Sequence, residues 1–176
     1  GSGIFVVSCY EYLATKMIQL FKEYDVERKT YPEYFYVCDD QWYLTIAGRR
    51  AIIKNCIYAI DCDEAAIEVT KMSLALKIVD GNVTLAWDGI GVFGNKILQD
   101  IADNIKLGNT LVDIDAKIPV DAIPLIKPMN ISTAFKDVFA TSCGFSYIVG
   151  NPPYVETKHY KAATPYMHSY LANNYF

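Results

Sequence analysis

Residues 57–63 read Ile-Tyr-Ala-Ile-Asp-Cys-Asp, and a helix-forming stretch follows them directly. The first four residues are apolar or aromatic, as in a short buried strand, and the run ends in acidic residues. Asp63 is a good N-cap for a helix from Glu64 to about Ile78. A strand, an acidic end and a helix in this order indicate one unit of an α/β domain.

Elements of the same two kinds are predicted on both sides of this unit. Apolar residues at spacings of three and four predict a helix over 4–22, and the charged, tyrosine-rich segment 23–50 is interpreted as an inserted β-hairpin that turns at Asp39-Asp40. Further elements are expected as a basic helix at 49–54, strands at 83–87, 105–107 and 145–149, a helix at 93–103, a long loop over 115–144 and a helical tail. Strands that alternate with helices favour one α/β domain with a mostly parallel sheet.

Charge and cysteine usage restrict the class of protein. The net charge of −4 argues against a chain-wide phosphate-binding surface, so any contact with DNA must be local or come from elsewhere. The five cysteines are odd in number and form no CxxC pair, which fits neither a disulfide framework nor a zinc site. Reduced thiols favour a cytoplasmic location. No apolar run approaches the roughly 20 residues that span a bilayer, so no membrane contact is expected.

A stiff polar corner follows the strand expected at 145–149. Residues 150–154 read Gly-Asn-Pro-Pro-Tyr. The two prolines fix φ near −65° and remove two N–H donors, while Asn151 before a proline is restricted to extended geometry. The corner therefore presents an amide side chain, the carbonyl of Pro152 and the ring of Tyr154 side by side, which suits a planar ligand with an exocyclic amino group. The alternative is a purely structural proline turn.

Taken in order, four motifs resemble those of N6-adenine DNA methyltransferases of the restriction-modification type, in the Type IIG, Eco57I-like arrangement. Gly1-Ser2-Gly3-Ile4-Phe5 is similar to the end of the cofactor loop, 57–63 to the second motif, 107–111 to the third and 144–155 to the catalytic motif. The resemblance implies a Rossmann-like S-adenosylmethionine-dependent methyltransferase fold. It covers nearly the whole chain, 1–176, as a partial catalytic domain truncated at both ends.

The resemblance also implies a role for each cofactor-site residue. Gly1 and Gly3 would let the first strand-to-helix turn approach the methionine carboxylate of S-adenosyl-L-methionine, unless Gly1-Ser2-Gly3 is an expression scar. Asp61 would accept hydrogen bonds from the ribose hydroxyls, or else serve only as a turn residue. Cys62 would form an apolar wall against the adenine or simply pack in the core. Asn109 takes the place of an aspartate that accepts from the cofactor's adenine amino group.

The catalytic roles implied by the resemblance fall on the proline corner. The Asn151 side-chain oxygen and the Pro152 carbonyl would each accept a hydrogen from the N6 amino group of the target adenine. Tyr154 would stack on that base after it leaves the duplex. No metal is expected, and His159 and His168 are interpreted as solvated.

The sequence also departs from the family pattern. Ser146 stands where an aspartate is usual before the corner. The family's first strand would precede Gly1, and later strands and the target-recognition domain would follow Phe176. We therefore expect the 176-residue chain alone to be weakly active or inactive, with double-stranded DNA bound mostly through other domains and with a restriction endonuclease and a specificity module, fused or separate, as partners.

Three other functions compete with this interpretation. Protein-glutamine N5-methyltransferases share the glycine loop and the Asn-Pro-Pro-Tyr corner, although the two motifs lie much closer together in those enzymes. A non-catalytic DNA-binding or scaffold module would keep the fold without the reaction. A nicotinamide-dependent protein with a Rossmann domain is suggested by the GxGxxG pattern at 89–94, with Asp113 about twenty residues further on.

Overall fold

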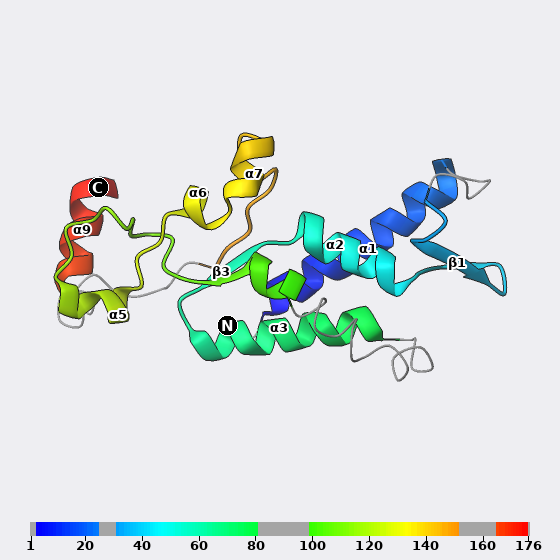
Figure 1. Ribbon diagram of the computed structural model, residues 1–176, viewed down its shortest axis with the longest axis horizontal. Helices are drawn as coiled ribbons and strands as arrows, with labels where there is room; N and C mark the ends of the chain where they lie inside the picture. The colour runs from blue at the N-terminus through cyan, green and yellow to red at the C-terminus, as the bar shows by residue number, and fades with distance from the viewer. Residues whose placement is uncertain (1–2, 25–30, 81–98, 152–164, 176) are drawn as a thin grey trace. The chain divides into compact units, whose positions relative to one another are not determined.

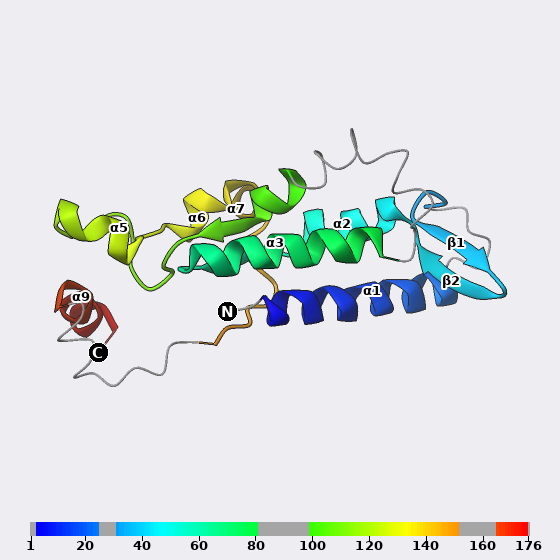
Figure 2. The same ribbon diagram turned by 90° about the horizontal axis from the view of Figure 1, so that it is seen from below.

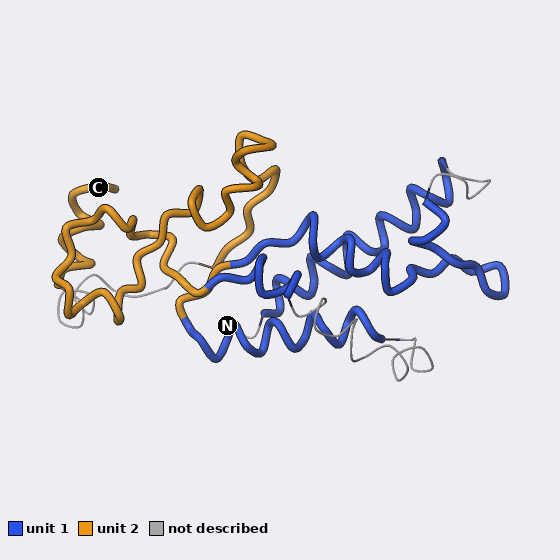
Figure 3. The backbone as a smooth tube through the Cα atoms, viewed as in Figure 1, with its two compact units in different colours: residues 1–59, 63–106 blue, residues 60–62, 107–176 orange. Residues whose placement is uncertain are grey.

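The computed structural model describes residues 3–24, 31–80, 99–151 and 165–175 (Figure 1). They divide into two compact units, which Figure 3 shows in two colours. Unit 1 consists of Gly1–Ala59 and Asp63–Lys106, and unit 2 consists of Ile60–Cys62 and Leu107–Phe176. The strand expected at 83–87, the beginning of the helix at 93–103 and the glycine pattern at 89–94 lie outside the described residues.

Unit 1 is built on α1 (Ile4–Tyr24), α2 (Ile46–Cys56) and α3 (Glu64–Val79), which pack on one another (Figure 2). The predicted helices at 4–22, 49–54 and from Glu64 are thus confirmed. Asp63 caps α3 as expected, because its Oδ1 accepts the N–H of Ala65 at 3.0 Å. The centre of the core is aliphatic, with the side chains of Ile53, Leu74, Ile78 and Ile101 fully buried.

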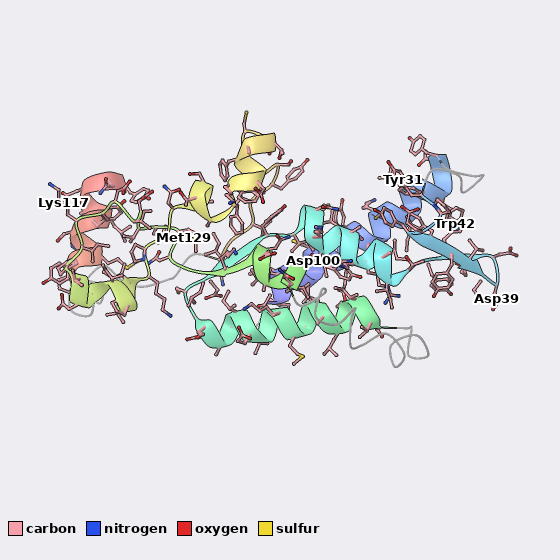
Figure 4. All side chains as sticks on the ribbon, in the orientation of Figure 1. Tyr31, Asp39, Trp42, Asp100, Lys117 and Met129 are labelled. Carbon is pink, nitrogen blue, oxygen red and sulfur yellow. The ribbon has the colours of Figure 1, made fainter. Side chains whose placement is uncertain are left out.

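The predicted hairpin consists of β1 (Phe35–Cys38) and β2 (Gln41–Leu44), which pair antiparallel. Asp39 and Asp40 form its two-residue turn with φ values of 48° and 60°. Two consecutive positive φ values match the right-handed twist of a tight hairpin, and aspartate tolerates them better than most residues. Figure 4 labels Asp39 in this turn. The hairpin is therefore confirmed.

Helix α1 meets the length and composition criteria of a membrane span, with a mean hydropathy of 1.2 over its 18-residue window. The sequence-based expectation of no such apolar run did not identify it. One side of the helix packs on the core through Val6, Leu13 and Met17. Glu11 on the same helix forms an ion pair of 2.5 Å with Lys77 of α3. These contacts attach one side of α1 to unit 1, while only 6% of its apolar window is buried.

The arginines of α2 bind elements of their own unit. Arg49 donates to the carbonyls of Lys77 at 3.3 Å and of Asp80, at the C-terminal end of α3, where backbone acceptors lack partners within the helix. Arg50 forms an ion pair with Asp100, which Figure 4 labels. The basic stretch at 49–54 thus serves the fold through these two side chains.

A buried amide connects α2 to the chain that follows it. The side-chain nitrogen of Asn104 donates to the carbonyls of Ile53 and Lys54 at 2.9 Å and of Ile57 at 3.0 Å. Asn104 is 7% exposed, so water does not readily replace these bonds. The amide therefore adds hydrogen bonds to carbonyls at and just after the end of α2.

The second sheet consists of β3 (Ala59–Asp61) and β4 (Ile105–Leu107). The predicted strand from Ile57 is confirmed in its second half, and the one at 105–107 is confirmed in full. This mixture of helices with a small parallel sheet is compatible with a methyltransferase fold, although the sheet is smaller than the one predicted.

The predicted buried strand at 145–149 is wrong for this structure. The segment belongs to no strand, and Tyr147, Ile148 and Val149 are 93%, 85% and 65% exposed. The apolar, β-branched composition is that of a strand, but composition provides neither ladder partners nor a covering layer. Within the described part of the chain, no segment pairs with these residues.

Unit 2 consists mainly of short helical pieces. They are a 3₁₀ turn η1 (Val120–Ala122), α5 (Ile123–Ile126), α6 (Ile131–Ala134), α7 (Lys136–Thr141) and the longer α9 (Pro165–Tyr175). The segment 115–144, expected as a long loop, thus contains several turns of helix. Pro119 precedes η1 and Pro128 follows α5 closely, and a proline limits the helical hydrogen bonds around it. A small core of Val112, Ile126 and Met167 holds the unit together.

We predict that Asn104→Ala lowers the free energy of unfolding by about 1–3 kcal/mol, because three carbonyls lose a buried donor. Urea denaturation followed by circular dichroism measures the change. The exposed Asn173→Ala is the control and should change stability by less than about 0.5 kcal/mol. Equal stability of the two variants would contradict the structural role of Asn104.

A second prediction concerns alkaline pH. Burial raises the pKa of Tyr10 to about 12. The unfolded chain loses this proton near pH 10 and the folded chain only near pH 12, so the contribution of Tyr10 to stability is complete below pH 10 and declines above it. We expect Tyr10→Phe to lose less stability than wild type between these pH values. Tyr12→Phe, at an exposed position of the same helix, should keep the wild-type pH dependence in urea denaturation.

Candidate functional site

Asp61 lies at the carboxyl end of β3 and is half-buried. Its backbone carbonyl accepts the N–H of Gly108 at 2.9 Å. This bond brings the end of β3 next to the end of β4, so that Asp61 and Asn109 follow two neighbouring strands. Ligands of α/β proteins bind at such carboxyl edges.

Asn109 is anchored by its own loop. Its side-chain oxygen accepts the N–H of Leu111 at 3.0 Å, as in an Asx turn, and its side-chain nitrogen lies 3.9 Å from the sulfur of Met167. An amide oxygen has two lone pairs, so it can accept one further hydrogen bond. The local contacts hold that oxygen in a defined position.

Residues 127–129 run alongside the Asn109 loop. The backbone N–H of Asn109 donates to Lys127 O at 2.8 Å, Pro128 forms a parallel bridge with Asn109, and the N–H of Met129 donates to Val112 O at 2.8 Å. The side chain of Met129, labelled in Figure 4, fills the space beside Gly108. A Cβ atom on this glycine would lie 2.3 Å from Met129 Cε, at the end of a flexible side chain, so a larger residue at position 108 would require the Met129 side chain to shift.

The same segment also reaches the Asp61 turn. The Nζ atom of Lys127 donates to the carbonyl of Cys62 at 2.9 Å. The sequence analysis missed Lys127, because a lysine in a proline-containing loop has no motif that marks it. Its αL backbone, with φ of 52°, is equally invisible in the sequence.

Cys62 itself is exposed, which does not fit the alternative of core packing. Its position directly after β3 places it at the same edge as Asp61. No group of three or more His, Cys, Asp or Glu side chains suited to a metal ion occurs among the residues that the structure describes.

The glycines of the first motif lie in unit 1. Gly1 is outside the described residues. Gly3 has φ of 70°, and a Cβ atom there would lie 2.3 Å from Thr70 Oγ1 on α3. Its carbonyl accepts the N–H of Val7 and so begins α1. In the described structure, the need for glycine at position 3 comes from this turn and from packing on α3.

Part of the proline corner is described. Asn151 is exposed, and so is Ser146 before it, whereas Pro152 and Tyr154 lie outside the described residues. A Cβ atom on Gly150 would have no other atom within 4 Å. The described part of the corner is therefore exposed to solvent.

A hollow of about 320 Å³ borders the Asn109 loop through Thr110. Phe139, Tyr170 and Tyr175 are among its aromatic lining residues. Asp113 lies at its wall and is engaged locally, since its carboxylate accepts the side-chain N–H of Asn130 at 3.0 Å. Asp113 was considered above for a nicotinamide site. In this structure its carboxylate already has a structural partner.

Comparison with known proteins adds three findings. The family model described as Eco57I restriction-modification methylase matches residues 55–176. The Type II restriction enzyme and methyltransferase RM.Eco57I of Escherichia coli is 29% identical over 165 residues, which cover 94% of this chain but only 15% of that protein. No solved structure matches the chain. Since the family model covers well over half of the sequence, the chain belongs to the Eco57I restriction-modification methylase family.

Proposed function

We propose that this chain is the cofactor-binding and catalytic part of a DNA adenine-N6 methyltransferase that acts in a restriction-modification system. The observation that carries the proposal is the Gly-Asn-Pro-Pro-Tyr sequence at 150–154, which lies inside the region matched by a methylase family. Family membership favours DNA over protein glutamine as the substrate. It also favours an enzyme over a scaffold module.

The proposed methyl donor is S-adenosyl-L-methionine, held in a Rossmann-like fold. The chemistry of the strand-end residues fits this ligand, because Asp61 offers a carboxylate for two hydroxyl groups and Asn109 retains an acceptor for an amino group. The bond between Asp61 O and Gly108 N keeps these acceptors on neighbouring strands. When bound, the cofactor supplies an electrophilic methyl group on a sulfonium. Exposed Cys62 would contact its adenine.

The proposed catalytic residues are Asn151, Pro152 and Tyr154. The side-chain oxygen of Asn151 and the carbonyl of Pro152 would accept the two hydrogens of the target amino group. Two acceptors at fixed angles orient the nitrogen lone pair towards the methyl group and stabilise the charge that develops on nitrogen. Tyr154 would stack on the flipped base, which compensates for part of its lost stacking in the duplex.

Double-stranded DNA is the proposed partner, with much of the contact made by other domains. The acidic chain supports this division, and so does the internal use of Arg49 and Arg50. The relative RM.Eco57I is named as both restriction enzyme and methyltransferase, which supports a nuclease as partner. A specificity module is the other proposed partner. The proposed location is the cytoplasm.

Asn151→Ala in the full-length protein is expected to lower methyl transfer to DNA by a factor on the order of 10² to 10³, because one of two transition-state acceptors is lost. Transfer of a radiolabelled methyl group measures the rate, and calorimetry with S-adenosylmethionine should show unchanged affinity. Asn173→Ala is the control. Wild-type rates in the Asn151 variant would exclude the proposed catalytic role.

Asp61→Asn is expected to weaken S-adenosylmethionine binding about tenfold or more, because a charged acceptor is lost from the proposed ribose contact. Calorimetry with the full-length protein measures the dissociation constant. The matched control is Asp63→Asn, in which asparagine still caps α3 and affinity should stay within about twofold. Equal effects at the two positions would refute a specific ligand contact by Asp61.

A further inference from the structure

We infer that Lys127 is a positioning residue that fixes the spacing between the Asp61–Cys62 turn and the Asn109 loop. The inference rests on the proposed function, since these are the two places where the cofactor would be held. It goes beyond that function because Lys127 belongs to none of the motifs.

Lys127 forms hydrogen bonds with both segments, one through its side chain and one through its backbone. Its ammonium nitrogen donates to Cys62 O at 2.9 Å, while its backbone carbonyl accepts the N–H of Asn109 at 2.8 Å. The two contacts join segments that lie 65 and 18 residues away in the sequence. One residue thus connects the ends of both proposed cofactor-binding strands.

The residues that follow Lys127 strengthen the connection to the second place. Pro128 bridges to Asn109, and Met129 donates its N–H to Val112 O at 2.8 Å and packs beside Gly108. The backbone from 127 to 129 is therefore held along the loop over several residues. The Cα atom of Lys127, from which the side chain extends, is therefore held in place relative to the Asn109 loop.

The backbone of Lys127 supports a role for its side chain. It caps the C-terminus of α5 in the αL conformation, with φ of 52° and ψ of 54°, and its N–H donates to Ile123 O at 2.8 Å. Glycine or asparagine is usual at such a position, because a Cβ atom is unfavourable there. For lysine the αL conformation is less favourable than for glycine. The lysine side chain, however, provides the ammonium contact with Cys62.

The consequence for the proposed reaction is specific. Loss of the ammonium contact releases the turn that presents Asp61. It does not touch the two acceptors proposed for the reaction, which are the Asn151 side-chain oxygen and the Pro152 carbonyl. Binding of the cofactor should therefore weaken, while turnover at saturating cofactor should be preserved. A residue needed only for folding would not separate these two quantities.

The test uses Lys127→Gly, which favours the αL backbone and removes the ammonium, and Lys127→Arg, which keeps a cationic donor. Lys127→Asn is a second neutral variant with an αL-tolerant residue, and Lys136→Met in α7 is the control for loss of an exposed lysine. For each full-length variant, calorimetry gives the dissociation constant for S-adenosylmethionine, methyl transfer gives KM and kcat, and hydrogen exchange reports on peptides that cover Ile60–Cys62 in the absence of cofactor.

We expect both neutral variants to raise the dissociation constant and KM about tenfold and to leave kcat within about twofold. The reason is that Asp61 would no longer be held in position for the cofactor. Hydrogen exchange at Ile60–Cys62 should become faster. Lys127→Arg and Lys136→Met should behave like wild type.

Wild-type affinity and wild-type exchange in Lys127→Gly and Lys127→Asn would overturn the inference, and so would a loss in Lys127→Arg as large as in the neutral variants. Failure of the wild-type protein to bind S-adenosylmethionine would instead refute the proposed function. In that case the exchange measurement would still decide whether Lys127 connects the two segments.

Discussion

The hydrogen bond from Gly108 N to Asp61 O is the interaction on which the candidate site depends. It joins the ends of β3 and β4 and so brings two residues that are 48 positions apart in the sequence to neighbouring strand ends. Gly108 leaves room for the adjacent Met129 side chain, which would have to shift if residue 108 carried a Cβ atom. A backbone contact thus places the acceptors of Asp61 and Asn109 at the same edge of the sheet.

Local signals predicted the parts of the fold that local interactions stabilise. The aspartate pair at 39–40 identified the hairpin because its turn needs two positive φ values, and Asp63 identified the start of α3 because a helix start needs an acceptor. Short helices in 115–144 were missed, since η1 and α5 depend on packing around Val112 and Ile126 more than on any periodic pattern.

Some residues of the candidate site could likewise be located from the sequence, and others could not. The strand-end positions of Asp61 and Asn109 follow from apolar runs that stop at polar residues, and the sequence was sufficient to locate them. The role of Lys127 arises from a contact across 65 positions and from a backbone conformation usually occupied by glycine, so no pattern in the sequence could indicate it. Gly3 differs from Lys127, because it belongs to a motif. Its close contact with Thr70 nevertheless gives a structural reason for a glycine at this position.

The exposed run before the proline corner connects the fold to the proposed chemistry. Two prolines stiffen the corner itself, but the direction in which Asn151 points is set by the segment that leads into it. Tyr147, Ile148 and Val149 are largely exposed, and within the described residues no strand pairs with them. Two acceptors can act at fixed angles only if this segment is held, since a mobile lead would spread their positions over more than the reaction tolerates. The proposed catalysis therefore requires 147–149 to gain backbone partners and apolar cover, and the apolar, β-prone composition of this segment is suited to both.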